Sequence, residues 1–87
     1  PVVSGIEIIS LNNLVEIYPN PSKDYFTVSN LNFADIAISN TFGQIVKYAT
    51  INPSNKKINI AELPAGLYFV TIEVGNHRVL VKKIIKY

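Results

Sequence analysis

The alternation of apolar and polar positions predicts β-strands along nearly the whole chain. Seven short runs rich in Val, Ile, Tyr, Phe and Thr are separated by turn residues, at the spacing of roughly 8–12 residues that is typical of sandwiches and barrels. No window carries the apolar spacing of a long amphipathic helix. The expected strands are Val15–Tyr18, Tyr25–Ser29, Asp35–Asn40, Ile45–Ile51, Lys57–Ile60, Leu67–Val74 and Arg78–Lys86.

Prolines and glycines mark the ends of these runs. Pro19 and Pro21 lack a backbone N–H, so the first strand must end before them. Asn20 and Pro21 suit the start of a type I turn in which the Asn side chain bonds its own backbone. After the third strand, Gly43 is expected to supply a positive φ in a hairpin. The segment 75–77, which contains His77, is expected to form a hairpin tip between the two longest strands.

The segment from Leu63 to Tyr68 predicts a structural corner. Pro64 and Gly66 fall at the second and fourth positions of a type I turn, and Tyr68 enters the next strand two residues later. This placement is typical of the tyrosine corner of immunoglobulin-like sandwiches, where the ring fills the core and the hydroxyl bonds a nearby backbone group. Val70, Ile72 and Val74 share its face, with Leu67 and Phe69 opposite, which indicates a central strand covered on both sides at its start. We therefore expect an all-β fold, a seven-stranded immunoglobulin-like antiparallel β-sandwich.

Composition and charge narrow the function classes. The 87 residues suit one domain, and 48% hydrophobic against 16% charged residues is a globular composition. The absence of Met, even at position 1, suggests a piece of a longer product, and the absence of Cys removes thiolate chemistry. The net charge of +2 combines a sum of −3 over residues 1–43 with +5 over residues 44–87. Three of these bases (Lys82, Lys83 and Lys86) lie together in the final expected strand, where they protect a sheet edge more simply than they bind nucleic acid.

The sequence offers no arrangement of residues typical of catalysis, a metal or a cofactor. His77 is the one His and stands at an expected turn, and the acids Asp24, Asp35, Glu62 and Glu73 are scattered over different elements. We expect no enzyme activity. Most aromatic residues are expected to pack in the core, namely Tyr18, Tyr25, Phe26, Phe42, Tyr48, Tyr68 and Phe69.

Residues 1–14 are expected to be a linker or an extra edge strand, and residues 15–87 the folded domain. The apolar run Ile6–Ile9 would be sticky if unpaired, so it pairs either with its own domain or with a neighbouring molecule in a homodimer.

The motifs, taken in order, resemble the type A C-terminal sorting domain of the type IX (Por) secretion system. They begin with Tyr18-Pro19-Asn20-Pro21 and continue with Gly43-Gln44-Ile45-Val46, Ile58-Asn59-Ile60, the stretch from Leu63 to Ile72, and the basic-apolar ending Lys82-Lys83-Ile84-Ile85-Lys86. The resemblance spans Val15 to Tyr87. It departs mildly from the family at Tyr87, which trails the final Lys, and at residues 40–42, where an acidic residue is more usual.

The resemblance implies an export address at the end of a larger secreted protein. It implies a covalently attached N-terminal cargo domain, passage through the periplasm, recognition by the type IX translocon, and removal by a sortase-like cysteine peptidase that cuts in or before residues 1–14. The cargo is then attached to the cell surface or released. The family's Gly-x-Tyr motif falls on Gly66 and Tyr68, and its terminal motif on Lys83–Lys86. With Lys82, this ending is the expected recognition site, while Pro19, Asn20, Pro21, Gly43, Leu63, Gly66 and Tyr68 form the structural motif.

The expected recognition surface is a positively charged edge built by the final strand. Val79, Val81 and Ile85 would close the sandwich on one face, while Lys82 and Lys86 project from the other toward an acidic or strand-donating receptor. Two other classes stay open: an immunoglobulin-like adhesion or carbohydrate-binding module, and a structural spacer domain.

Overall fold

The computed structural model describes residues 14–75 and 78–87, which form seven strands. Two of them, β4 and β7, have the predicted bounds. Four differ from prediction by one or two residues at one end, and β3 begins and ends one residue earlier than predicted. The strands are β1 (Ile17–Tyr18), β2 (Tyr25–Val28), β3 (Ala34–Ser39), β4 (Ile45–Ile51), β5 (Lys57–Asn59), β6 (Gly66–Val74) and β7 (Arg78–Lys86).

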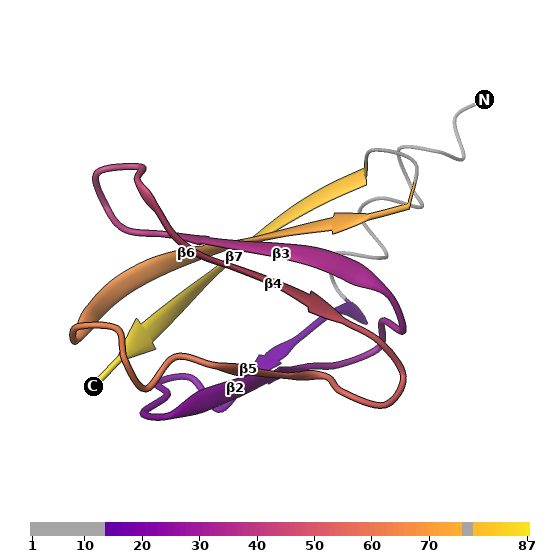
Figure 1. Cartoon of the computed structure of the whole chain (residues 1–87), viewed down its shortest axis with the longest axis horizontal. Helices are drawn as coiled ribbons and strands as arrows, with labels where there is room; N and C mark the ends of the chain where they lie inside the picture. The colour runs from indigo at the N-terminus through magenta and orange to yellow at the C-terminus, as the bar shows by residue number, and fades with distance from the viewer. Residues whose placement is uncertain (1–13, 76–77) are drawn as a thin grey trace.

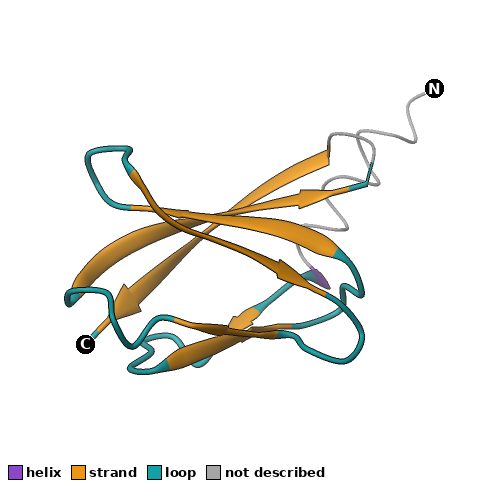
Figure 2. Cartoon of the chain, in the orientation of Figure 1, coloured by secondary structure: helices purple, strands orange, loops and turns teal. Residues whose placement is uncertain are grey.

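The strands form two stacked sheets (Figures 1 and 2). One has the order β1-β2-β5, the other the order β4-β3-β6-β7, and all the pairings within them are antiparallel. The prediction of an all-β sandwich of seven strands is confirmed. The strand β6 lies between β3 and β7, so the prediction that it is a central strand is confirmed. The prediction that its start is covered on both sides is wrong, because Leu67 on the outer side is 38% exposed.

The core lies between the two sheets and is mostly aliphatic. In β6, Tyr68, Val70 and Ile72 are buried and Val74 is half-buried, as the alternation of this strand predicted. The prediction that most aromatic residues enter the core is wrong for five of the seven. Four are exposed at outward positions or turns, namely Tyr18, Tyr25, Phe42 and Tyr48, and Phe69 is half-buried on the outer side of β6. The buried apolar residues of the core are Val15, Phe26, Val28, Leu31, Ala34, Ile36, Ile38, Ile51, Ile58, Ile60, Leu63, Tyr68, Val70, Ile72, Leu80 and Ile84.

The tyrosine corner forms as predicted between β5 and β6. The Tyr68 hydroxyl donates a hydrogen bond of 2.6 Å to the Pro64 carbonyl, and its ring is buried. Gly66 has a φ of 153°, a conformation that L side chains rarely adopt. Leu63 is buried, and its N–H donates to the Ile60 carbonyl at 3.0 Å. The corner therefore fixes the direction in which β6 enters its sheet.

The β3–β4 connection also has the predicted hairpin geometry. Gly43 has a φ of 82°, and its N–H donates to the Asn40 carbonyl at 3.0 Å. The Asn40 side chain accepts hydrogen bonds from the N–H groups of Phe42 and Gln44 at 2.9 and 3.1 Å. At the β6–β7 connection, the expected tip residues Asn76 and His77 lie outside the described residues.

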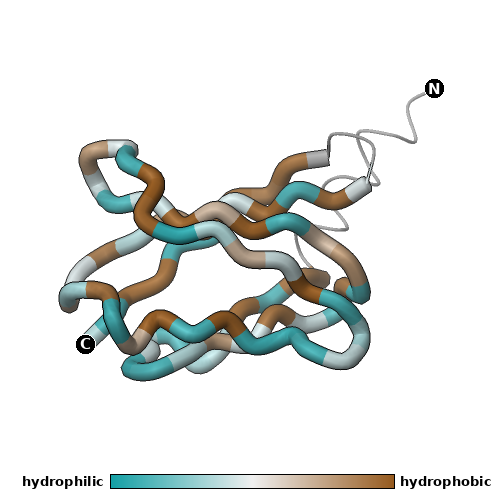
Figure 3. Tube along the Cα trace, viewed as in Figure 1, coloured by the Kyte–Doolittle hydropathy of each residue, from teal (hydrophilic) through white to brown (hydrophobic). Residues whose placement is uncertain are grey.

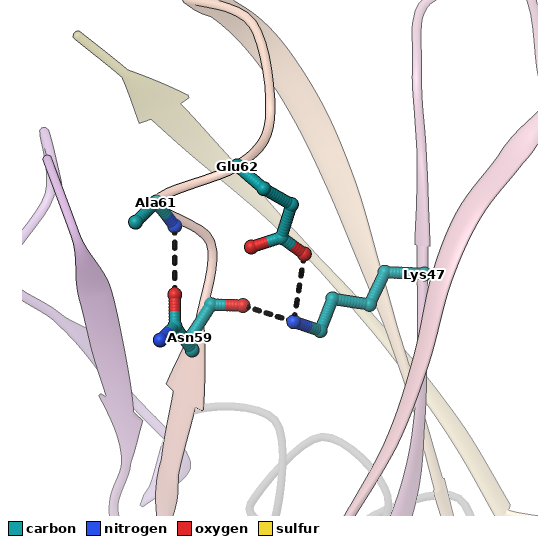
Figure 4. Close-up of polar contacts among 4 residues, drawn as sticks. All are labelled: Lys47, Asn59, Ala61 and Glu62. Carbon is teal, nitrogen blue, oxygen red and sulfur yellow. Dashed lines mark hydrogen bonds and ion pairs between the residues drawn. The ribbon is translucent and has the colours of Figure 1, made fainter.

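A polar contact ties the two sheets together at one margin of the sandwich (Figure 4). The Lys47 ammonium on β4 lies 2.9 Å from the Glu62 carboxylate and also donates to the Asn59 carbonyl at the end of β5. The hydrogen bond from Lys47 lowers the pKa of the Glu62 carboxyl from its ordinary value. Because the Glu62 side chain is largely exposed to water, this ion pair adds little to the folding stability of the domain.

Candidate functional site

The Pro19-Asn20-Pro21 motif lies along the outer edge of β7. The Asn20 amide donates a hydrogen bond of 3.0 Å to the Lys83 carbonyl, and its oxygen accepts one of 3.0 Å from the Ile85 N–H. The expectation that the Asn20 side chain bonds its own backbone is wrong, since both of its hydrogen bonds go to β7. The Tyr18–Pro19 and Asn20–Pro21 peptides are both cis. Neither proline has a backbone N–H, so the Asn20 side chain supplies the donor and acceptor that a neighbouring strand would offer.

Ser22 continues this edge contact with its own backbone. Its N–H donates to the Ile85 carbonyl at 2.7 Å, and its carbonyl accepts from the Tyr87 N–H at 3.0 Å, which makes a parallel bridge. Ser22 is fully buried, and its hydroxyl donates to the Pro19 carbonyl. The edge of β7 from Lys83 to Tyr87 is therefore already occupied, and a receptor strand cannot add there.

The two faces of β7 are the reverse of the prediction. Leu80 and Ile84 point into the core and are buried, whereas Val79, Val81 and Ile85 lie on the outer face with exposed fractions of 51%, 55% and 49%. The register with β6 fixes this arrangement, because residues directly opposite each other on neighbouring strands project to the same face. The inward residues Tyr68, Val70 and Ile72 pair with Ile84, Lys82 and Leu80.

The lysines follow the same alternation. Lys86 points inward, is only 8% exposed, and donates from its ammonium to the Tyr87 carbonyl at 3.0 Å. Lys82 is half-buried on the same side, and Lys83 is exposed on the outer face. The prediction that Lys82 and Lys86 project together from the face away from the core is therefore wrong. A lysine on the core-facing side is tolerated when its apolar stem packs and its ammonium reaches a polar group.

Of the five expected recognition residues, only Lys83 and Ile85 lie on the outer face; Lys82, Ile84 and Lys86 point inward. The outer face of β7 is consequently apolar with one positive charge, and it is not a basic surface.

The structure brings most of the structural motif to one place. Gly66, at the tyrosine corner, pairs directly with Lys86, and Asn20 bonds the opposite edge of β7. Gly43 lies apart, in the β3–β4 hairpin. The contact between Asn20 and β7 was missed from the sequence. An amide residue between two prolines was the available signal, but it did not identify a partner more than 60 residues away.

The described parts of the chain offer no group of three or more His, Cys, Asp or Glu side chains that would hold a metal ion. No helix within residues 14–75 and 78–87 is both long enough and apolar enough to cross a membrane.

The fold is a small β-sandwich of two antiparallel sheets with its own core. The chain belongs to the secretion-system C-terminal sorting domain family, whose model matches residues 16–87. This is a family of non-catalytic tails, and the chain is accordingly a C-terminal sorting signal that directs a larger protein through the type IX secretion system.

Two curated proteins are similar to this chain. Beta-agarase A of Zobellia galactanivorans is 33% identical over 69 residues, which are 76% of this chain and 13% of the agarase. Ulvan lyase NLR42 of Nonlabens ulvanivorans is 31% identical over 74 residues, which are 82% of this chain and 14% of the lyase. The chain thus spans only about one seventh of the length of these relatives.

Proposed function

We propose that this domain addresses a polysaccharide-degrading enzyme to the type IX translocon, which reads the domain through residues of β7. The two similar proteins are an agarase and an ulvan lyase, and each is much longer than the matched segment. The proposal rests on one observation: Asn20 and Gly66 both contact the C-terminal end of β7, from opposite edges of the strand. Motifs far apart in the sequence thus hold one strand in a fixed position.

The proposed route follows from the family. The attached cargo crosses the periplasm with its sorting domain folded, and a sortase-like cysteine peptidase then removes the domain so that the cargo is attached to the surface or released. Val15 is buried in the core, so the bond that is cut lies upstream of it, in or before residues 1–14. This boundary between a linker and the domain at 15–87 is part of the proposal.

A fusion experiment tests the function. Residues 1–87 are placed behind a signal peptide and a fluorescent reporter and expressed in a bacterium with a working type IX system. We expect reporter at the cell surface or in the medium, and reporter confined to the periplasm in a strain without the translocon. The Tyr68→Ala fusion serves as an unfolded control. Reporter retained by wild-type cells would refute the proposal.

The role of charge is tested separately. Lys83→Gln is the clean substitution, because Lys82 and Lys86 face the core side and their replacement disturbs packing as well. If charge is read, the Lys83→Gln fusion is exported poorly while its unfolding midpoint stays unchanged. Normal export of this folded variant would show that the charge of Lys83 is not read.

The proposed homodimer through Ile6–Ile9 concerns residues outside the described ranges. Sedimentation equilibrium of residues 1–87 against residues 15–87 tests it, with a dimer expected only for the longer chain.

A further inference from the structure

Several apolar residues neighbour one another on the outer side of β6 and β7, while Asp35 and Glu73 lie on another part of the same side of the sheet. In the register of β6 and β7, Leu67 lies opposite Ile85, and Phe69 lies opposite Lys83. Val81 is the next outward residue along β7. Tyr48 of β4 lies in the same row across the sheet as Val81, with Ala37 and Thr71 between them. We call this set the outer apolar face: Tyr48, Leu67, Phe69, Val81, Lys83 and Ile85.

The fold itself leaves this surface in water. None of its members belongs to the core between the sheets, and the exposed fractions of Leu67, Val81 and Ile85 are 38%, 55% and 49%. Antiparallel sheets with one solvated face usually alternate apolar-in with polar-out residues. Hydrophobic residues recur along β7 (Figure 3). They lie on both faces of the strand, since Leu80 and Ile84 are buried while Val79, Val81 and Ile85 are exposed. Contiguous exposed apolar surface of this kind marks a site of interaction.

The charge on this face selects the kind of partner. Lys83 has Val81 and Ile85 as its outward neighbours along β7 and Phe69 directly opposite on β6. No described residue forms an ion pair with its ammonium. A purely apolar partner would bury the Lys83 ammonium without an opposite charge, which is costly, so the partner must supply a carboxylate there.

This placement disfavours a second copy of the chain as the occupant. A second copy, packed about a two-fold axis centred on this face, would bring two Lys83 ammonium groups toward each other.

We propose that the outer apolar face docks onto a protein of the export machinery whose contact surface is apolar and carries an acidic side chain opposite Lys83. This inference rests on the proposed function and names the surface through which it is exerted. The edge of β7 from Lys83 to Tyr87 is occupied by Asn20 and Ser22, so the partner meets the strand from its face and does not extend the sheet there.

Export of the reporter fusion tests this surface with matched variants. Val81→Thr/Ile85→Thr keeps β-branched residues while it removes apolar contact, and Lys83→Glu reverses the charge. Each is expected to lower export about tenfold or more, since binding energy concentrates in few residues of an interface. Phe42→Thr and Lys23→Glu, at exposed positions off this face, are the controls and should export normally. Lys83→Arg should retain export.

Thermal unfolding of each purified variant separates a docking defect from a folding defect. A folded Val81→Thr/Ile85→Thr domain that is exported like wild type overturns the inference while the sorting function stands. If the wild-type fusion itself is retained, the proposed function fails and the inference falls with it.

Two further measurements identify the occupant. A photo-reactive residue at position 81 should crosslink to a translocon component during export, whereas one at position 42 should not. The inference is overturned if the purified domain instead binds anionic vesicles through this face. It is equally overturned if the domain dimerises through this face in sedimentation, with dimerisation lost in Val81→Thr/Ile85→Thr.

Discussion

Replacing Asn20 by Ala tests whether its side chain holds β7 in place. The substitution removes two hydrogen bonds of 3.0 Å, one to the Lys83 carbonyl and one from the Ile85 N–H. A hydrogen bond contributes a net 0.5–1.5 kcal/mol, so the loss is about 1–3 kcal/mol, and water at this exposed site favours the lower half of that range. In a domain of this size, each kcal/mol lowers the unfolding midpoint by about 4–8 °C.

Urea unfolding followed by circular dichroism measures this loss, since the chain has no Trp to report by fluorescence. Asn32→Ala is the matched control, because Asn32 is exposed and has no hydrogen bond to another described residue; it should change stability by less than about 0.5 kcal/mol. Hydrogen exchange adds a local readout, in which the Ile85 amide exchanges faster in Asn20→Ala. If Asn20→Ala is as stable as Asn32→Ala, the assigned role of the motif is incorrect.

Substitutions at three further positions test the fold. Tyr68→Phe loses the bond to the Pro64 carbonyl and should cost about 1 kcal/mol, whereas Tyr68→Ala also empties part of the core and should cost about 3–5 kcal/mol; equal costs in urea unfolding would contradict the corner geometry. Gly43→Ala forces a side chain into a φ of 82° and should cost about 1–2 kcal/mol by the same measurement, and an unchanged midpoint would contradict this. Because Lys47 lowers the pKa of Glu62, the ion pair contributes at neutral pH and its contribution is lost as the pH falls through that lowered pKa. Glu62→Gln should therefore show a shallower loss of stability toward acid than wild type, and parallel pH profiles would refute this reading.

Local signals allowed much of the fold to be predicted. The tyrosine corner needs only residues within four positions of each other, and the Asn40–Gln44 hairpin five consecutive residues, so both are visible in the sequence. The strand β4 begins and ends where its β-branched run does. These elements depend on turn chemistry and alternation, which act over short distances along the chain.

Local signals in the sequence could not predict which face of β7 points into the core. Its two faces are nearly equal in apolar content, since Val79, Val81 and Ile85 share one with Lys83, and Leu80 and Ile84 share the other with Lys82 and Lys86. Counting apolar residues selected the wrong face. What decides the matter is the pairing register with β6, whose inward Tyr68 and Val70 fix the inward residues of β7.

Asn20 bonds to Lys83 and Ile85 of β7, which lie 63 and 65 positions further along the chain. This separation affects when the domain can form. During synthesis on the ribosome, residues 14–22 emerge well before the strand that they hold. Closing so long a loop is among the slower steps of folding, and it cannot begin until Ile85 is available. A nascent chain that stalls or is truncated before this point has an upstream cargo but no completed sandwich. A chain that ends before Ile85 lacks the backbone groups to which Asn20 bonds, so its sandwich cannot close in this way.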